Sequence, residues 1–387
     1  MVARIDRRQF LGGAAAGAVL ALARTSAALQ AGWAPTDVHK TLQTRLADPY
    51  CAEAPLPRLV GSWLTPLDAF FVLDRSAEPA LDADHRIEVV GEVRRPLSIR
   101  VGDLLGGFPT VEVPATIACA GNRRREHSAL RRVADPLQWG AGAIGTARWG
   151  GARLVDVLEA AGLRGGARHV WFEGADRAGF GGSIPLEVAL RRDAPVVLAA
   201  TMNGAPLPRA HGFPVRAVVP GFVGARSVKW LRRIVVSVRT SDNPHFTHAH
   251  RVGGAPIYTA PINAAIGAAV RAGDAIDVAG YAMPTGHPDA RIERVEVSFD
   301  RGATWTVADL GAEAAPCCWQ LWTLRTRLPV AARSITARAY DSSGAAQPPR
   351  APWNPGGYLY DGWYELPLPA RERELQPRAP ISRSGTR

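Results

Sequence analysis

Short apolar runs and one helical pattern mark residues 86–238. The runs at 86–93, 114–120, 169–172, 196–199, 215–220 and 228–238 predict strands, several of them buried. Residues 154–161 carry apolar side chains at helical spacing and are followed by Gly162, which predicts a helix with a glycine C-cap. Strands mixed with helix indicate an α+β domain, which we place at residues 36–252.

The pattern changes near residue 260, beyond which little helical periodicity remains. Residues 291–299, 319–327 and 334–340 alternate apolar with polar side chains, and Asp300-Arg301-Gly302 predicts a turn into a returning strand at 304–307. Several short strands joined by turns predict an immunoglobulin-like β-sandwich over residues 260–368. Residues 369–387 are rich in Arg, Pro and Ser, so we expect them to be disordered.

Composition narrows the class of protein. A chain of 387 residues favours two domains, and 47% hydrophobic residues exclude a largely disordered protein. The absence of an apolar run of about 20 residues excludes a multi-span membrane protein, and four cysteines are too few for a disulfide scaffold. The net charge of +11 does not by itself indicate nucleic acid, and we expect no such partner.

The N-terminus has the order of an export signal. Arg7-Arg8 is followed by Phe10-Leu11, an apolar stretch of small residues, and a candidate cleavage site near residues 25–28. The arginine pair is typical of the twin-arginine type, which exports folded proteins, often with a cofactor inside. We therefore expect residues 1–28 to be a twin-arginine signal and the mature protein to be periplasmic, without a membrane segment. The alternative is an uncleaved membrane anchor.

Cys119 ends the apolar run 114–120 and is soon followed by three consecutive arginines, 123–125. A cysteine at the end of a buried strand is by default a small core residue. Neighbouring guanidinium groups, however, lower the pKa of a thiol and favour the thiolate, which ligates metals, and they also attract anions. Both interpretations remain open on the residues alone. A zinc site is disfavoured because Cys119 has no second ligand at metal spacing.

Residues 210–230 are rich in glycine and contain four basic groups, His211, Arg216, Arg226 and Lys229. Glycine lets the backbone approach a ligand, and spaced basic groups suit a phosphate. The alternative is a solvated loop followed by an edge strand.

Three further motifs favour an ordinary structural interpretation. Residues 140–145 satisfy G-x-G-x-x-G, but no helix follows them, so a dinucleotide site is disfavoured. His245, His248 and His250 could bind a transition metal, but without carboxylate or thiol companions a solvated loop is favoured. The adjacent Cys317 and Cys318 favour strand packing over a disulfide.

Six motifs occur here in the order seen in one enzyme family. They are CAGNRR at 119–124, GAIGTARW at 142–149, FEGAD at 172–176, MNGAPLP at 202–208, HGFPVR at 211–216 and GARSVKW at 224–230. Over about residues 65–368 the chain therefore resembles the sulfite oxidase family of molybdopterin-dependent oxidoreductases.

The resemblance implies a fold, a cofactor and roles for individual residues. It implies an α+β molybdopterin-binding domain followed by an immunoglobulin-like sandwich that pairs two chains into a homodimer. It implies a Mo-molybdopterin cofactor whose metal is held by the Cys119 thiolate. Positions that match the pterin and phosphate contacts are Phe71, Asp176, His211, Arg216, Ser227, Val228 and Lys229. Positions that match the substrate surroundings are Arg124 and Trp139, with His250 nearest the place of an active-site tyrosine.

The activity that the resemblance implies is oxygen-atom transfer, foremost the oxidation of sulfite to sulfate. The chain has no C-x-x-C-H motif and no cytochrome b5-like segment, so we expect no haem in it and a separate c-type cytochrome as electron acceptor. The alternatives are oxidation of another sulfur compound, such as a sulfane or thiosulfate, or reduction of an S- or N-oxide. A non-enzymatic alternative is a cofactor-free binding partner.

Three positions depart from the family pattern. Leu73 and Gly356 stand where substrate arginines are expected, and His250 stands where the tyrosine is expected, while Arg75 is a candidate replacement for the first arginine. Loss of two guanidinium groups weakens binding of a dianion by roughly 1.5–3 kcal/mol each, which favours a larger or less anionic substrate. We expect His250 to donate a hydrogen bond in place of the tyrosine and to titrate near neutral pH.

Overall fold

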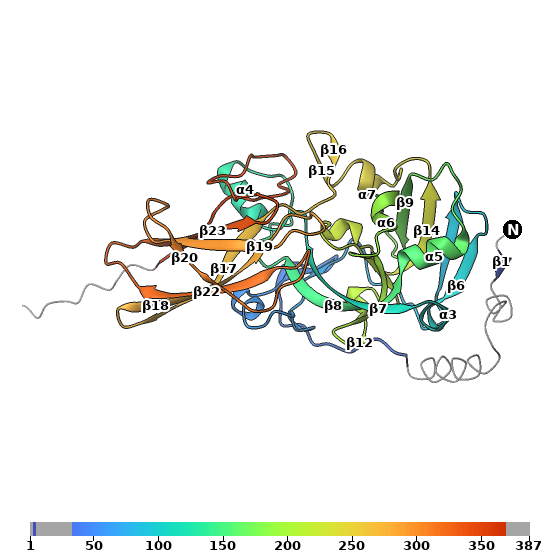
Figure 1. The fold of residues 1–387 in the computed structure, drawn as a ribbon, viewed down its shortest axis with the longest axis horizontal. Helices are drawn as coiled ribbons and strands as arrows, with labels where there is room; N and C mark the ends of the chain where they lie inside the picture. The colour runs from blue at the N-terminus through green and yellow to red at the C-terminus, as the bar shows by residue number, and fades with distance from the viewer. Residues whose placement is uncertain (1–2, 5–32, 369–387) are drawn as a thin grey trace, which may run out of the picture.

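The computed structural model describes residues 3–4 and 33–368, which form two domains along the long axis of the molecule (Figure 1). Apart from Ala3 and Arg4, the predicted export signal lies outside the described residues, and so does the predicted disordered tail at 369–387. In the described part of the chain no helix is long and apolar enough to cross a membrane.

Two sheets and the helices between them build the first domain. One sheet has the order β1 (Ala3–Arg4), β6 (Leu97–Arg100), β5 (Arg86–Gly91), β14 (Leu231–Ser237), β9 (His169–Gly174) and β10 (Gly181–Pro185). The other has the order β12 (Ala205–Pro206), β11 (Val197–Met202), β8 (Ile144–Arg153) and β7 (Thr110–Ala118), with β13 (Arg216–Val218) also paired to β11. Mixed parallel and antiparallel pairing confirms the predicted α+β class.

Shorter elements join and cover these sheets. The helices are α2 (Leu56–Leu59), α3 (Val101–Gly107), α4 (Arg124–Leu130), α5 (Leu154–Ala161), α6 (Leu186–Ala189) and α7 (Pro244–Thr247), with 3-10 turns η1 (Arg209–His211) and η2 (Gly224–Arg226). A small sheet has the order β2 (Gln43–Leu46), β3 (Cys51–Glu53) and β4 (Val72–Leu73), and β15 (Arg251–Val252) pairs with β16 (Ala255–Pro256).

Helix α5 shows how the sequence pattern becomes packing. Leu154, Val157 and Leu158 are fully buried and share one hydrophobic cluster with residues of both large sheets, among them Val89 and Leu198. The helix ends at Gly162, whose φ of 69° is the left-handed conformation that a glycine C-cap supplies. Both the helix and its cap are confirmed.

Two four-stranded sheets build the second domain. Their orders are β17 (Asn263–Ala272), β18 (Ala275–Met283), β22 (Gln320–Arg327), β21 (Asp309–Leu310), and β20 (Thr306–Val307), β19 (Ile292–Ser298), β23 (Ser334–Asp341), β24 (Tyr364–Pro367). The inward-facing residues of both sheets, such as Val278, Trp322, Val295 and Ala337, form one core, as the predicted alternation requires. The sandwich prediction is confirmed.

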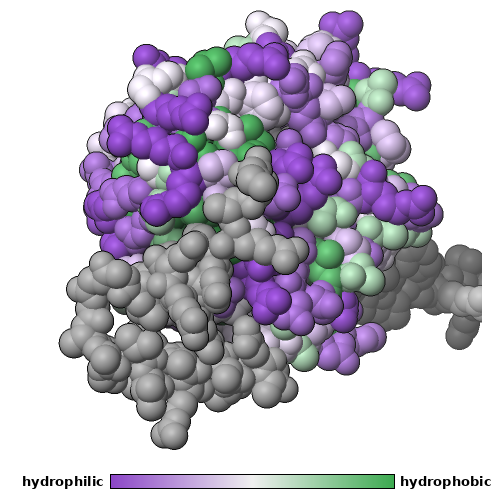
Figure 2. Space-filling model, turned by 90° about the vertical axis from the view of Figure 1, so that its right-hand side faces the viewer, coloured by the Kyte–Doolittle hydropathy of each residue, from purple (hydrophilic) through white to green (hydrophobic). Residues whose placement is uncertain are grey.

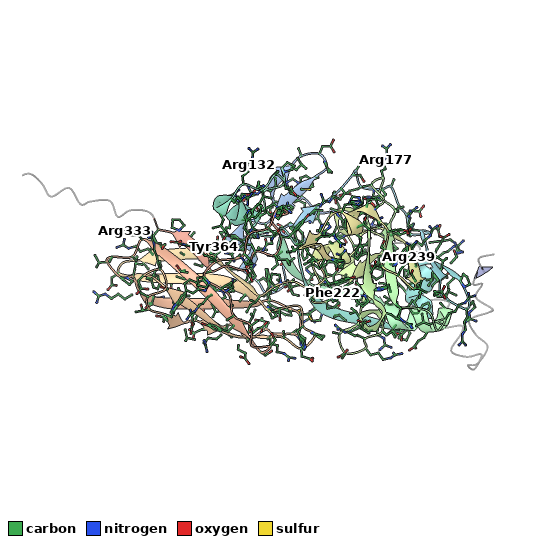
Figure 3. The ribbon with its side chains drawn as sticks, turned by 90° about the horizontal axis from the view of Figure 1, so that it is seen from above. Arg132, Arg177, Phe222, Arg239, Arg333 and Tyr364 are labelled. Atoms are coloured by element: carbon green, nitrogen blue, oxygen red, sulfur yellow. The ribbon has the colours of Figure 1, made fainter. Side chains whose placement is uncertain are left out.

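The domains are joined by buried contacts near the middle of the molecule, where Figure 3 shows Phe222. The backbone of Phe222 bridges to Thr259, and the Tyr281 hydroxyl of the sandwich donates to the carbonyl of Ala141 at 2.8 Å. At the end of the first domain away from the sandwich, most of the coloured surface in Figure 2 belongs to hydrophilic side chains.

Candidate functional site

A cavity in the first domain collects most of the residues that the sequence singled out. Its empty volume is about 760 Å³, which includes the solvent-open space at its mouth. Its walls come from the segment before residue 76, the end of β7, η1, β13 and the loop after η2. Of the residues expected to contact cofactor or substrate, Arg124 and Trp139 do not line it, and neither does Arg226, one of the four basic groups that suited a phosphate. Those that line it are Phe71, Cys119, Asp176, His211, Arg216, Ser227, Val228, Lys229 and His250.

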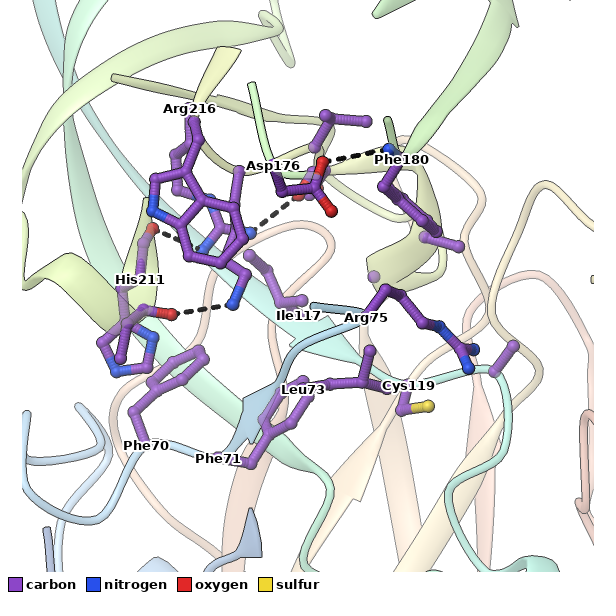
Figure 4. A pocket seen from close by; sticks show the side chains of 18 of the residues that line it. Phe70, Phe71, Leu73, Arg75, Ile117, Cys119, Asp176, Phe180, His211 and Arg216 are labelled. Atoms are coloured by element: carbon purple, nitrogen blue, oxygen red, sulfur yellow. Dashed lines mark hydrogen bonds between the residues drawn. The ribbon is translucent and has the colours of Figure 1, made fainter. Parts of the chain in front are cut away.

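The cavity has two chemically different ends (Figure 4). Cys119, Leu73 and Arg75 lie on one side of the view, and we call them, together with His250, the thiol end. His211 and Arg216 lie on the other side of the view. Arg216 donates to the Ser227 carbonyl and Lys229 to the carbonyl of Ala210, next to His211, so we call His211, Arg216, Ser227 and Lys229 the cationic end.

Cys119 follows directly on the last residue of β7, in a tight loop. The Asn122 amide donates to the Cys119 carbonyl at 2.9 Å, and the Gly121 amide donates to Sγ at 3.4 Å. Burial raises the pKa of the thiol and outweighs the opposite influence of Arg124 and of the Gly121 amide. The expectation that the neighbouring arginines produce a low thiol pKa is therefore wrong.

The first two arginines after Cys119 are engaged elsewhere. Arg123 has a left-handed backbone, with φ of 66°, and its buried guanidinium donates to Glu126, to Asn263 and to carbonyls of the second domain. Arg124 pairs with Asp135 at 2.8 Å and donates to the carbonyls of Leu137 and Gly356. The Arg123 guanidinium is therefore held by the second domain and by Glu126, whereas Nη2 of Arg124 has no hydrogen-bond partner in the described part of the chain.

Arg124 and Trp139 stand behind the cavity wall. The Arg124 guanidinium lies 5.1 Å from the ring centroid of Tyr358, and the fully buried Trp139 packs edge-on against Phe71, with ring centroids 6.5 Å apart. Neither side chain lines the cavity, and their predicted place in the substrate surroundings stays a prediction. Arg124 thus contacts Tyr358, on which His250 of the thiol end stacks, and Trp139 contacts Phe71 of the cavity wall.

His250 lies at the thiol end and is only 4% exposed, which corrects the expectation of a solvated histidine loop. Its ring stacks on Tyr358, with centroids 5.6 Å apart, and its φ of 52° is a left-handed conformation that is strained for a residue other than glycine. Burial lowers the pKa of His250 to about 3, with Arg75 as a further cause, so the expected titration near neutrality is wrong.

The other two histidines of that motif do not join His250 in a metal site. His245 packs against Phe180, and His248 is exposed. Among the described residues no group of three or more metal-ligating side chains comes together.

Arg216 is the central group of the cationic end. It is 4% exposed, and its guanidinium donates to the carbonyls of His211 at 3.0 Å and Ser227 at 2.8 Å. Burial lowers its pKa to about 9, and within the described ranges it has no carboxylate at ion-pair distance. A buried cation without a counter-ion beside a cavity is the arrangement that binds an anion.

The cationic end also includes one carboxylate that the sequence motifs did not reveal, beside the predicted Asp176. The Lys229 ammonium pairs with Asp74, a buried carboxylate that the motif comparison passed over. Its position in the sequence could have indicated Asp74, because Asp74 directly follows Leu73, one of the residues that depart from the family pattern. Asp176 accepts from the Phe180 amide at 3.0 Å and lines the same cavity.

The two remaining motifs have structural roles. The G-x-G-x-x-G stretch leads into strand β8 at Ile144 and not into a helix, which confirms that it is no dinucleotide fingerprint. Cys317 and Cys318 are buried free thiols, so no disulfide joins them, but they lie in the turn before β22 and not in a strand as expected.

Comparison with known proteins identifies two successive domains. The family described as oxidoreductase molybdopterin binding domain matches residues 75–245, and that described as Mo-co oxidoreductase dimerisation domain matches residues 256–370. Sulfite oxidase of Gallus gallus is 42% identical over 84% of this chain and 77% of its own length. The mitochondrial sulfite oxidase of Homo sapiens is 39% identical over 85% of this chain, which spans 66% of that protein.

More distant relatives match as well. A nitrate reductase of Hordeum vulgare is 34% identical over 83% of this chain and 41% of its own length. The solved sulfane dehydrogenase SoxCD from Paracoccus pantotrophus superposes with a TM-score of 0.72 at 26% identity, covering 82% of this chain and 83% of that one. Because both domain families match in order and relatives are this similar, the chain belongs to the sulfite oxidase family of molybdopterin-dependent oxidoreductases.

Proposed function

We propose that this protein is a molybdopterin-dependent oxidoreductase that oxidises a small sulfur compound, with sulfite as the foremost substrate. The observation that carries the proposal is the shape of one cavity, which has a thiol at one end and an unpaired buried guanidinium at the other. That pair of groups matches a cofactor with a metal at one end and a phosphate at the other.

The residues present fit such a cofactor. Arg216, Lys229 and His211 supply charge and donors for a phosphate, and Cys119 supplies the sulfur ligand for molybdenum. Phe71 and Val228 supply apolar walls for the pterin, and Asp176 supplies an acceptor. When bound, the cofactor supplies oxygen-atom transfer and accepts electrons.

At the thiol end the protein itself would position the substrate. Arg75 is the cation that lines this end, and the neutral ring of His250 offers one hydrogen-bonding nitrogen to the cavity while the other lies 3.3 Å from the His245 carbonyl. Oxidation of sulfite to sulfate takes an oxygen atom from water and releases two electrons and two protons. We propose a separate c-type cytochrome, with no haem in this chain, as the acceptor of those electrons.

A second candidate is oxidation of a sulfane or thiosulfate. It is favoured by Leu73, an apolar side chain where a substrate cation is expected, and by the likeness to sulfane dehydrogenase SoxCD. Reduction of an S- or N-oxide at the same site is a weaker alternative, because it needs a reducing partner in place of an acceptor.

Two further statements belong to the proposal. The match of residues 256–370 to a dimerisation domain supports a homodimer, which light scattering at micromolar concentration tests. The Arg7-Arg8 motif supports export to the periplasm through the twin-arginine pathway, and changing both arginines to lysine should leave the protein in the cytoplasm.

The decisive experiment is metal analysis and steady-state kinetics of protein purified from a host that makes molybdopterin. We expect about one molybdenum per chain and a kcat/KM for sulfite with cytochrome c of at least ~10⁴ M⁻¹s⁻¹. A value far below this together with rapid thiosulfate oxidation would replace sulfite by the second candidate. Folded wild-type protein without molybdenum would reject the function and favour a cofactor-free binding partner.

A further inference from the structure

Lysine is almost absent from this chain, which has 44 arginines and two lysines, Lys40 and Lys229. Both lysines nevertheless meet at the cationic end. Lys229 lines the cavity, and Lys40 Nζ lies 2.5 Å from Nε2 of His211. An ammonium is a compact group with three rotatable donors, whereas a guanidinium is a planar fork. The choice of lysine therefore indicates a geometry at this place that arginine does not satisfy.

The surroundings of Lys40 use all three donors of a charged ammonium. Besides His211 Nε2, the acceptors are the carbonyls of Leu67 at 2.6 Å and Phe70 at 3.3 Å. His211 Nε2 is then an acceptor, so the neutral imidazole carries its proton on Nδ1. Among the described residues Nδ1 has no hydrogen-bond partner, and His211 lines the cavity. One N–H donor of His211 is thus left for a ligand.

The charge around Lys40 points to an anionic ligand. Burial and the nearby Lys229 lower the pKa of Lys40 to about 7, while Asp68, Glu78 and Asp74 act on it in the opposite direction. None of these three carboxylates is at ion-pair distance from Lys40. An anion bound between Lys229 and Arg216 would offset the repulsion and favour the charged form of Lys40.

We propose that Lys40 is a positioning residue of the cofactor site: it holds His211 in the tautomer that donates to the cofactor's anionic group, and its charge helps to retain that group. This inference rests on the proposed function, since it takes molybdopterin as the ligand. Lys40 lies outside residues 75–245, which match the molybdopterin-binding family, so the segment before residue 75, which also supplies Phe71, contributes to a site built mostly by that domain.

The test compares cofactor retention in Lys40→Met, Lys40→Arg and the matched control His39→Gln, which changes the exposed neighbour. Molybdenum and pterin per folded chain are measured, followed by the rate at which pterin dissociates. We expect Lys40→Met to lose the cofactor at least ~10-fold faster than wild type. Lys40→Arg should restore only part of the retention, because its planar donors do not match three converging acceptors.

A double-mutant cycle tests the route through His211. If Lys40 acts by orienting His211, then Lys40→Met should have little further effect in a His211→Ala background. Equal fold-changes in both backgrounds would overturn that route. Wild-type retention in Lys40→Met would overturn the proposal as a whole, as would a loss explained by a lower melting temperature of the cofactor-free variant.

A second probe separates this inference from the proposed function. Cofactor-free protein is titrated with inorganic phosphate while its melting temperature is followed. We expect phosphate to stabilise wild type and His39→Gln but not Lys40→Met. If purified wild type contains no molybdopterin yet shows this difference, the anion site stands and only the proposed function fails. Equal stabilisation of all three proteins would overturn the role of Lys40.

Discussion

The two ends of the cavity are built in different ways. At the cationic end, Arg216 is held by main-chain carbonyls, and the four residues that define that end belong to motifs shared with the family. At the thiol end only Cys119 belongs to such a motif, while Leu73 and His250 depart from the family pattern. The contrast shows that retention of the cofactor and choice of the substrate rest on separable groups of residues.

The two ends of the cavity also differ in charge. Arg216 and Lys229 leave positive charge at the cationic end that Asp74 offsets only in part. At the thiol end the cavity is lined by Arg75 together with an apolar Leu73 and a neutral His250. A strongly anionic group is therefore accommodated better at the cationic end, and a substrate of lower charge at the thiol end.

The largest expected effect comes from removing the sulfur of the thiol end. Cys119→Ser should lose more than about 100-fold in activity and most of the molybdenum, since loss of even an outer-shell partner costs 10–100-fold. Metal analysis and kinetics measure this, and Cys317→Ser is the matched control because its buried thiol lies outside the cavity lining. Full retention of metal in Cys119→Ser would contradict the assignment.

The next largest effect should come from removing the Arg216 guanidinium at the cationic end. Arg216→Met should reduce cofactor retention about 10–100-fold, because a charge-assisted hydrogen bond contributes ~1.5–3 kcal/mol. Arg226→Met is the control: Arg226 is equally buried and donates to the Ile257 carbonyl, but it does not line the cavity. We expect this control to lose stability and keep its cofactor, so equal cofactor loss in both variants would argue against a specific anion site.

The third prediction concerns acid stability and His250. Its pKa is about 3 in the folded protein and near 6.5 when unfolded, so the unfolded state binds more protons below pH 6.5. The free energy of unfolding is therefore unaffected above pH 6.5 and falls as the pH drops toward 3, by about 2 kcal/mol at pH 5. His250→Gln should remove that part of the pH dependence in cofactor-free protein, measured by thermal unfolding between pH 5 and 7.5.

A matching result should appear in the kinetics. The pKa of His250 lies far below neutrality, so His250 should not titrate near pH 6.5. We therefore expect the pH profiles of kcat/KM for wild type and His250→Gln to have the same shape between about pH 5.5 and 7.5. An inflection near pH 6.5 that is present in wild type and absent in His250→Gln would contradict this, because it would mean that His250 gains a proton in that range.

The smallest expected effect tests substrate charge at the thiol end. If sulfite is a poor substrate, Leu73→Arg should raise its kcat/KM by about 10-fold, since it restores one guanidinium contact, and Leu73→Met serves as the uncharged control. Gly356→Arg is not a useful partner, because a Cβ at Gly356 would lie 2.4 Å from the Tyr358 ring. No gain from Leu73→Arg would mean that this position does not exclude sulfite.

Local features of the molecule followed from the sequence. Helix α5 and its cap at Gly162 are set by spacing within a few residues, and the strands of the sandwich by simple alternation. The ordered motifs also indicated the family, the two domains and the cavity residues Cys119, Arg216 and Lys229. Each of these inferences depends on neighbours in the chain or on a pattern shared with relatives.

Only the tertiary structure decided where charges point and what surrounds them. Arg123 and Arg124 stand beside Cys119 in sequence, yet their guanidinium groups bind the second domain, Asp135 and main-chain carbonyls. His250 was expected to titrate near neutrality, but burial that no local pattern reveals lowers its pKa to about 3. Lys40 contacts His211 although the two residues are 171 positions apart in the chain. Hydrogen-bond partners and desolvation depend on the whole fold, so a local pattern identifies a residue type but not its electrostatic environment.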